Sequence, residues 1–174
     1  MVNQMKNIRI EKITLNVGSG RDQQKLERGV TLVKQITGIE PVKAATTKRI
    51  AGWGLRPGLP VGCKLTLRGE KARELLVRFL ESKENMLPER SFDNEGNVSF
   101  GIPEYIEIPG VEYNPDVGIM GFEVSISLER PGFRVKKRRY KRGAIDKDHG
   151  ISKEEAMEFM KESFNIAIGE THDV

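Results

Sequence analysis

Side chains suited to binding phosphate are concentrated in residues 43–73. Eight Lys or Arg residues and a single acid give this stretch a net charge of +7. A threonine, Thr66, stands between Lys64 and Arg68, and the preceding loop contains Trp53. Lysine and arginine contact phosphates, hydroxyls donate hydrogen bonds to them, and an aromatic ring stacks on unpaired bases. We interpret these residues as a surface that binds RNA.

A second basic run occupies residues 134–142, where seven of nine positions are Lys or Arg. A run this dense repels itself, so in isolation we expect it to be disordered. It could serve only solubility or localisation. Because a first basic stretch already exists, we favour contact with RNA phosphates.

Acidic residues lie in separate blocks of the chain. Residues 74–133 have a net charge of −8 and residues 152–174 of −4, although the whole chain carries +4. This sorting predicts a polyanion partner on one side of the molecule and a different contact, or solvent, on the other.

Groups that commonly perform catalysis are scarce. The two histidines, His149 and His172, lie in polar segments, and neither has a second His or Cys at metal-ligand spacing. We expect His149 to be a solvated loop residue and His172 to lie in a frayed terminus. Cys63 is the single cysteine, so neither a disulfide nor a cysteine metal site is expected. We therefore predict no enzymatic activity, no metal and no cofactor.

Acidic side chains of the predicted last helix are expected to form a solvated surface, namely Glu154, Glu155, Glu158 and Glu162. Such charge runs usually face water. They provide no second candidate for catalysis.

A glycine-rich turn, Gly18-Ser19-Gly20, follows the first predicted strand. A phosphate-binding loop would need a terminal Gly-Lys-Ser/Thr, and a dinucleotide-binding turn would need a third glycine. Neither follows here. The alternative function, a nucleotide-using RNA-modifying enzyme with this turn at its phosphates, therefore has weak support.

Hydrophobic periodicity predicts the main elements. Period-two alternation indicates strands at residues 8–17, 61–68, 98–102 and 122–128, the first with a phase slip at Glu11-Lys12. Helical spacing indicates helices at residues 21–37 and 70–82, with Gly38 as a C-cap, and another after the capping box Ser152–Glu155. Residues 83–97 and 109–121 are expected to be loops, and the strand ending at 102 could continue through 105–108.

This order of elements predicts an α+β fold. The antiparallel β-sheet would carry its helices on one face, as in a ferredoxin-like sandwich, and its other face would stay open. Residues 44–69 would form a hairpin whose first arm begins at Pro41 and whose loop spans residues 50–60. Trp53 could fold back onto the domain, or it could stay exposed at the tip.

The chain length fits one domain with an extension. We predict an RNA-binding core at 1–133, a basic arm at 134–151 and an acidic amphipathic helix with a tail at 152–174. That helix would dock on the core or on a partner, and the second choice would make the chain a protein-interaction module. The N-terminus lacks a signal-peptide core, and no run approaches the roughly 20 apolar residues of a membrane span. We expect a cytoplasmic protein.

Several longer motifs resemble a known family. Residues 33–69, which include Ala44-Ala-Thr-Thr-Lys-Arg49 and Ala51-Gly-Trp-Gly-Leu-Arg-Pro-Gly58, closely resemble the signature region of the ribosomal large-subunit protein L-five family. Glu11–Gly18, Ser91-Phe-Asp and Gly121-Phe-Glu-Val resemble the same family. The chain lacks the long N-terminal helix of the bacterial form and has the basic arm and the acidic last helix. These differences resemble the archaeal and eukaryotic branch.

The resemblance implies a structural protein of the central protuberance that binds 5S rRNA and large-subunit rRNA. The resemblance also implies three further partners: P-site tRNA, large-subunit protein L-eighteen and small-subunit protein S-thirteen. It implies no contact with a membrane. From the basic stretches and the resemblance together, we predict RNA-binding residues at Asn16, Thr47, Lys48, Arg49, Lys64, Thr66, Arg68, Arg134, Lys136, Lys137, Arg138 and Arg139. The loop that approaches tRNA would be Ala51, Gly52, Trp53, Gly54, Leu55, Arg56, Pro57 and Gly58.

Overall fold

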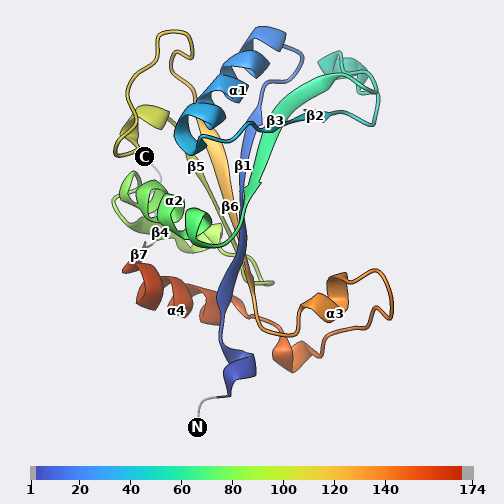
Figure 1. The fold of residues 1–174 in the computed structure, drawn as a ribbon, viewed down its shortest axis with the longest axis vertical. Coiled ribbons are helices and arrows are strands. Elements are labelled where there is room, and N and C mark those ends of the chain that lie inside the picture. Colours follow the sequence, from blue (N-terminus) through green and yellow to red (C-terminus); the bar gives the residue numbers. More distant parts are fainter. Residues whose placement is uncertain (1–2, 170–174) are drawn as a thin grey trace.

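A five-stranded antiparallel sheet in the order β2-β3-β1-β6-β5 organises the computed structural model, which describes residues 3–169. Its strands are β1 (Arg9–Gly18), β2 (Val42–Ala45), β3 (Pro60–Leu67), β5 (Asn97–Ile102) and β6 (Phe122–Glu129). Helices α1 (Gln23–Thr37) and α2 (Glu70–Glu81) lie against one side of it (Figure 1). The predicted α+β fold is confirmed.

The two central crossovers have the ferredoxin-like form. Strands β1 and β2 are joined through α1 and have β3 between them, while β3 and β6 are joined through α2 and β5 and have β1 between them. Each pair is antiparallel to the strand it encloses, so its two members run parallel to each other. This arrangement places both helices on the same face of the sheet.

Helix α1 begins and ends where the sequence indicates. The side chain of Asp22 accepts hydrogen bonds from the backbone N–H groups of Gln24 and Lys25, which the first turn would otherwise leave unpaired. Gly38 ends the helix in the left-handed conformation, with φ +70°. Buried Gly29 lets the helix approach β1 closely, since a Cβ there would lie 2.9 Å from Val17 Cγ1.

A β-bulge in β1 produces the phase slip seen in the sequence. The pairing of β1 with β6 shifts between Ile10 and Lys12, which leaves Glu11 as the extra residue. Because one added residue reverses the alternation, Ile8 and Ile10 before the bulge and Ile13 after it all pack into the core.

The final helix, α4 (Lys153–Phe164), packs on this chain's own core. Ile151, Ala156 and Met160 are buried in the same hydrophobic cluster as the sheet and the other helices. The predicted capping box is present, with Ser152 and Glu155 bonding each other's backbone N–H groups. The apolar face of α4 is therefore used within the chain.

Residues 83–97 are not a continuous loop. Met86–Pro88 forms β4, which pairs in parallel with β7, Ala167–Gly169, in a separate two-stranded sheet. Such a short strand carries little periodic signal, and it forms because its partner β7, far along the chain, lies beside it.

The possible strand at 105–108 is instead a 3₁₀ helix, Tyr105–Glu107. Tyr105 is fully buried there, and its hydroxyl accepts a hydrogen bond from Asn114 N at 2.9 Å.

The remaining elements are short. Helix α3 is Arg134–Lys137, and the other 3₁₀ helices are Gln4–Lys6, Ala51–Trp53, Glu89–Ser91 and Lys147–His149. His149 is not a solvated loop residue, because its ring packs edge-on against Phe133 and its Nε2 lies 2.9 Å from Pro131 O. His172 lies outside the described residues. Within residues 3–169, no helix has the length and apolar character needed to cross a membrane.

Candidate nucleic-acid interface

The face of the sheet opposite α1 and α2 is polar. Because side chains alternate along β1 and β3, Asn16, Lys64 and Thr66 point away from the helices and are exposed. Asn16 and Lys64 are direct neighbours across the two strands, and Thr14 pairs with Thr66 in a nearby row. The structure thus brings together sequence-predicted residues from two separate strands. We call this surface the open face.

Strand β6 adds acidic residues to the open face, and these were not among the predicted site residues. Glu123 lies beside Asn16, whose Nδ2 donates to Glu123 Oε2 at 3.2 Å. Glu129 lies at the other end of β6 and pairs with Arg9 at 2.8 Å. Both carboxylates alternate with the buried residues of β6, so the period-two pattern already indicated their side of the strand.

The β2–β3 hairpin carries the predicted loop at its tip. Backbone hydrogen bonds from Thr46 N to Leu59 O, at 2.9 Å, and from Gly58 N to Thr46 O, at 2.8 Å, close the base of the tip. Leu55 is its buried anchor, while Trp53 is 70% exposed. Trp53 therefore does not cover the domain. Exposed neighbours on the tip are Thr47, Lys48, Arg49, Ala51, Gly52, Gly54, Arg56, Pro57 and Gly58.

The basic arm is ordered against the sheet. Its exposed cations include Arg134, Lys136, Lys137, Arg138 and Arg139. Lys137 Nζ forms ion pairs with Glu11, the bulge residue of β1, and with Glu129 at 3.5 Å. The Arg138 and Arg142 guanidiniums bond backbone carbonyls within the arm, at 2.6 and 2.5 Å. These contacts counter the self-repulsion expected from the sequence.

The two basic segments lie at opposite ends of the molecule. Figure 1 shows the hairpin tip and the α3 arm projecting from its upper and lower parts, on the side away from α2 and α4. The open face connects them. Two cationic segments with a polar sheet between them form a long surface that suits an extended polyanion.

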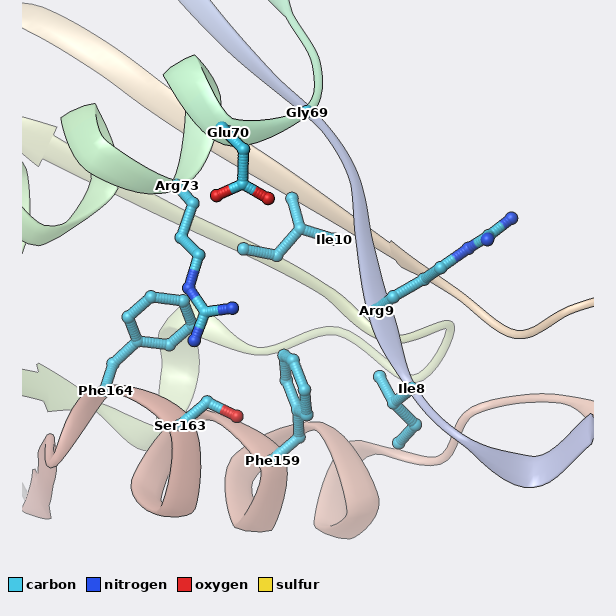
Figure 2. A pocket seen from close by; sticks show the side chains of 9 residues that line it. All are labelled: Ile8, Arg9, Ile10, Gly69, Glu70, Arg73, Phe159, Ser163 and Phe164. Atoms are coloured by element: carbon cyan, nitrogen blue, oxygen red, sulfur yellow. The ribbon is translucent and has the colours of Figure 1, made fainter. Parts of the chain in front are cut away.

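A separate cavity of about 240 Å³ opens between the start of β1, α2 and α4. Figure 2 shows Ile8, Ile10 and Phe159 around it, whereas Arg9 extends away from it. The Arg73 guanidinium stacks 5.8 Å from the centre of the Phe164 ring. Ser163 and Glu70 add a hydroxyl and a carboxylate to the lining.

Burial and hydrogen bonding account for the shifted pKa values of Cys63 and Asp93. Burial raises the pKa of the Cys63 thiol, which keeps it protonated and inert within β3. Partial burial opposes ionisation of Asp93, but hydrogen bonds from Asn97 and the backbone N–H of Glu95 bring its pKa below the usual value. Asp93 thereby fixes the turn before β5. Across residues 3–169, no cluster of three His, Cys, Asp or Glu residues is arranged to hold a metal ion.

Comparisons with known proteins indicate the same ribosomal protein family over almost the whole chain. Residues 3–56 match the model for the family described as "Ribosomal protein L5", and residues 60–159 match the model for the C-terminus of the same ribosomal family. "Large ribosomal subunit protein uL5" of Sulfurisphaera tokodaii is 46% identical over 97% of this chain and 96% of its own length. The protein of the same name from Nanoarchaeum equitans is 44% identical over 97% and 99%. That of Nitrosopumilus maritimus is 39% identical over 94% and 95%.

Proposed function

The chain belongs to the ribosomal protein L5 family of the large ribosomal subunit, and we propose that it binds 5S rRNA and large-subunit rRNA in the central protuberance of that subunit. Proteins of this family are structural components of the ribosome. The observation that carries the proposal is the open face, where Asn16, Lys64 and Thr66 lie together and are exposed. The two basic segments extend it at either end.

Lys64, Arg68 and the basic arm supply most of the affinity in this proposal. Each lysine or arginine that neutralises a phosphate releases a condensed counterion, so binding weakens steeply as salt rises. Thr66 and Asn16 donate hydrogen bonds that fix the position of the RNA backbone. The affinity is therefore largely electrostatic, and the short polar side chains set the register.

The hairpin tip is proposed to contact P-site tRNA. The ring of Trp53 is 70% exposed, and Arg56 is exposed on the same loop. An exposed aromatic ring next to a cation can stack on a base or ribose while the cation meets a phosphate. Family membership further supports large-subunit protein L-eighteen and small-subunit protein S-thirteen as protein neighbours.

We propose that the protein is not an enzyme. The turn Gly18-Ser19-Gly20 uses its amides within the fold, since Ser19 N and Gly20 N both donate to Val61 O, at 2.9 and 3.1 Å. The start of α1 is already capped by the carboxylate of Asp22. A nucleotide phosphate would find a negative charge there instead of free N–H donors, so nothing favours the nucleotide-using alternative.

The proposal is tested by binding the purified protein to 5S rRNA against excess tRNA over a series of salt concentrations. We expect binding that resists the competitor and whose logarithm falls linearly with log salt. Lys64→Glu combined with Arg68→Glu should weaken it strongly and leave the circular dichroism spectrum and melting curve close to wild type. Equal competition by tRNA would contradict a specific site.

The matched control is a second double variant that makes the same change in charge at residues away from the open face. Lys25→Glu combined with Arg28→Glu alters two exposed cations of α1 by the same amount. Long-range repulsion alone would weaken binding equally in both double variants. Arg68 is exposed directly after the end of β3, two positions beyond Thr66. A much larger loss for Lys64→Glu with Arg68→Glu would assign the effect to direct contact.

A further inference from the structure

A glycine-rich depression lies at one end of the open face. It is a wide, shallow hollow of roughly 600 Å³ that is largely open to solvent. Backbone of β1, β5 and β6 forms its floor, and its lining is Asn16, Gly18, Lys83, Gly101, Ile102, Pro103, Gly121, Phe122 and Glu123. Three side chains supply its hydrogen-bonding groups: an amide, an ammonium and a carboxylate.

Two of its glycines are not required by the fold. Gly18 and Gly101 lie in strands without a positive φ, and a Cβ built at either meets no atom within 4 Å. Gly121 differs, because its Cβ would lie 2.5 Å from Pro103 O. Glycine weakens a strand interior, and one without an internal packing reason commonly marks close approach by a ligand. The bare floor at Gly18 and Gly101 leaves room for a flat group.

The carboxylate of Glu123 determines what that group can be. It lies in the row Lys64–Asn16–Glu123–Gly101 across four strands, where Asn16 Nδ2 donates to its Oε2 at 3.2 Å. That bond orients the carboxylate and leaves its Oε1 without a partner among the described residues. An ionised carboxylate only accepts hydrogen bonds and repels phosphate. The ligand must therefore present N–H or O–H donors at this point.

We infer that this depression binds one unstacked guanine of the RNA, with the N1–H and N2–H₂ groups of the base donating to Glu123. The ring would lie on the floor at Gly101, directly beside Glu123 in the sheet, and Lys83 would meet the adjoining phosphate. The inference rests on the proposed RNA-binding function and adds a base-reading site to it. Single-stranded bases in RNA are commonly read in this way, by contacts to their Watson–Crick edges.

The other bases fit the carboxylate less well. Adenine and cytosine each place one amino donor beside a ring nitrogen acceptor, and uracil places one N–H between two carbonyl acceptors. A carboxylate facing any of them would set an oxygen against an acceptor lone pair. Guanine has two adjacent donors on its Watson–Crick edge, which match the two oxygens of a carboxylate.

The test is interference mapping with inosine, which lacks the N2 amino group of guanine. 5S rRNA and a large-subunit rRNA fragment are transcribed with sparse inosine phosphorothioate, and protein-bound and free molecules are cleaved and compared. We expect at least one guanine position where inosine is depleted about tenfold from the RNA bound to wild-type protein. With Glu123→Gln that depletion should disappear. Glu74→Gln, on α2, makes the same charge change away from the open face and should keep the wild-type pattern.

Gly101→Ala tests the site without altering charge. The added methyl meets nothing within 4 Å, so the melting temperature should be unchanged or slightly higher, while RNA binding falls by about tenfold. Loss of folding in this variant would contradict the structural premise. Normal RNA binding together with poor incorporation into ribosomes would overturn the inference and assign the depression to a protein side chain such as arginine.

The outcomes separate this inference from the proposed function. If wild-type protein bound neither 5S rRNA nor the large-subunit rRNA fragment specifically, both the proposed function and the guanine site would be overturned. Wild-type binding with identical inosine patterns for wild type and Glu123→Gln would overturn the guanine site alone. The expected pattern with intact binding by the Glu74→Gln control would support both.

Discussion

The guanidinium of Arg130 and the carboxylate of Glu155 lie 2.7 Å apart and join the end of β6 to the first turn of α4. The Arg130 side chain is only 5% exposed. It also donates to Gly150 O at 2.6 Å and to Lys6 O at 3.1 Å. One buried arginine thus holds the N-terminal segment, the end of the basic arm and the last helix together.

Arg130→Met should destabilise the protein by about 2 kcal/mol, because the carbonyls of Lys6 and Gly150 lose their buried donor and the 42% exposed Glu155 side chain loses its partner. Urea unfolding followed by circular dichroism measures this loss. Arg28→Met, at an exposed position of α1, is the control and should change stability by at most about 0.5 kcal/mol. Equal losses in both variants would contradict the role of Arg130.

The stability of the wild-type protein should decrease in acid partly through Glu155. Partial burial acts to raise the pKa of Glu155, but the backbone N–H of Ser152 and the Arg130 guanidinium bring it below its usual value. A lowered folded-state pKa gives stability that is present above the unfolded-state pKa and lost as pH falls through the folded-state pKa. Glu155→Gln should therefore be less stable at pH 7 and show a shallower loss on acidification. Glu158→Gln, exposed on the same helix, should keep the wild-type profile when unfolding is measured from neutral to acidic pH.

Neighbouring cations of the basic arm should differ in their effect on RNA binding. Lys137 is already paired with Glu11 and Glu129, whereas the side chain of Lys136 is exposed without an ion pair in the described part of the chain. Lys136→Met should lower the slope of log affinity against log salt by about one, as for one lost phosphate contact. Lys137→Met should change that slope less and reduce stability by at most about 1 kcal/mol. The reverse order of slopes would mean that RNA releases Lys137 from its carboxylates.

Trp53→Ala should change the stability of the free protein by no more than about 0.5 kcal/mol, because the ring is 70% exposed. Binding to 5S rRNA should also remain, since the tip lies beyond the open face. Translation by ribosomes reconstituted with the variant should be impaired, with P-site tRNA occupancy as the readout. Loss of 5S rRNA binding to the same extent would show that the tip belongs to the rRNA site.

Local patterns in the sequence predicted most of the sheet. The alternation in β3 and β6 identified the buried face of each strand, and the slip at Glu11-Lys12 identified the bulge in β1. Gly38 and Ser152 marked helix ends, because capping residues act on backbone groups only a few positions away. Such features depend on near neighbours and can be read without a fold.

Pairings between distant residues could not be read in this way. The parallel pairing of β4 with β7, the contact of Arg130 with Lys6 and the bond between Asn16 and Glu123 each join segments far apart in the chain. A short strand or a single arginine has the same composition whether or not such a partner arrives. For this reason the expected solvated role of His149 was wrong, and the bond between Arg130 and the partly exposed Glu155 was not predicted.

By itself, the sequence determined the type of fold, the family and the concentration of positive charge in two segments, since these follow from periodicity, motif and composition. The tertiary structure alone decided that Lys137 is neutralised by Glu11, that Trp53 stays exposed and that Glu123 lies beside Asn16. The physical reason is that charge and periodicity belong to the chain, whereas ion pairing, exposure and hydrogen bonding depend on which distant surfaces the fold brings together.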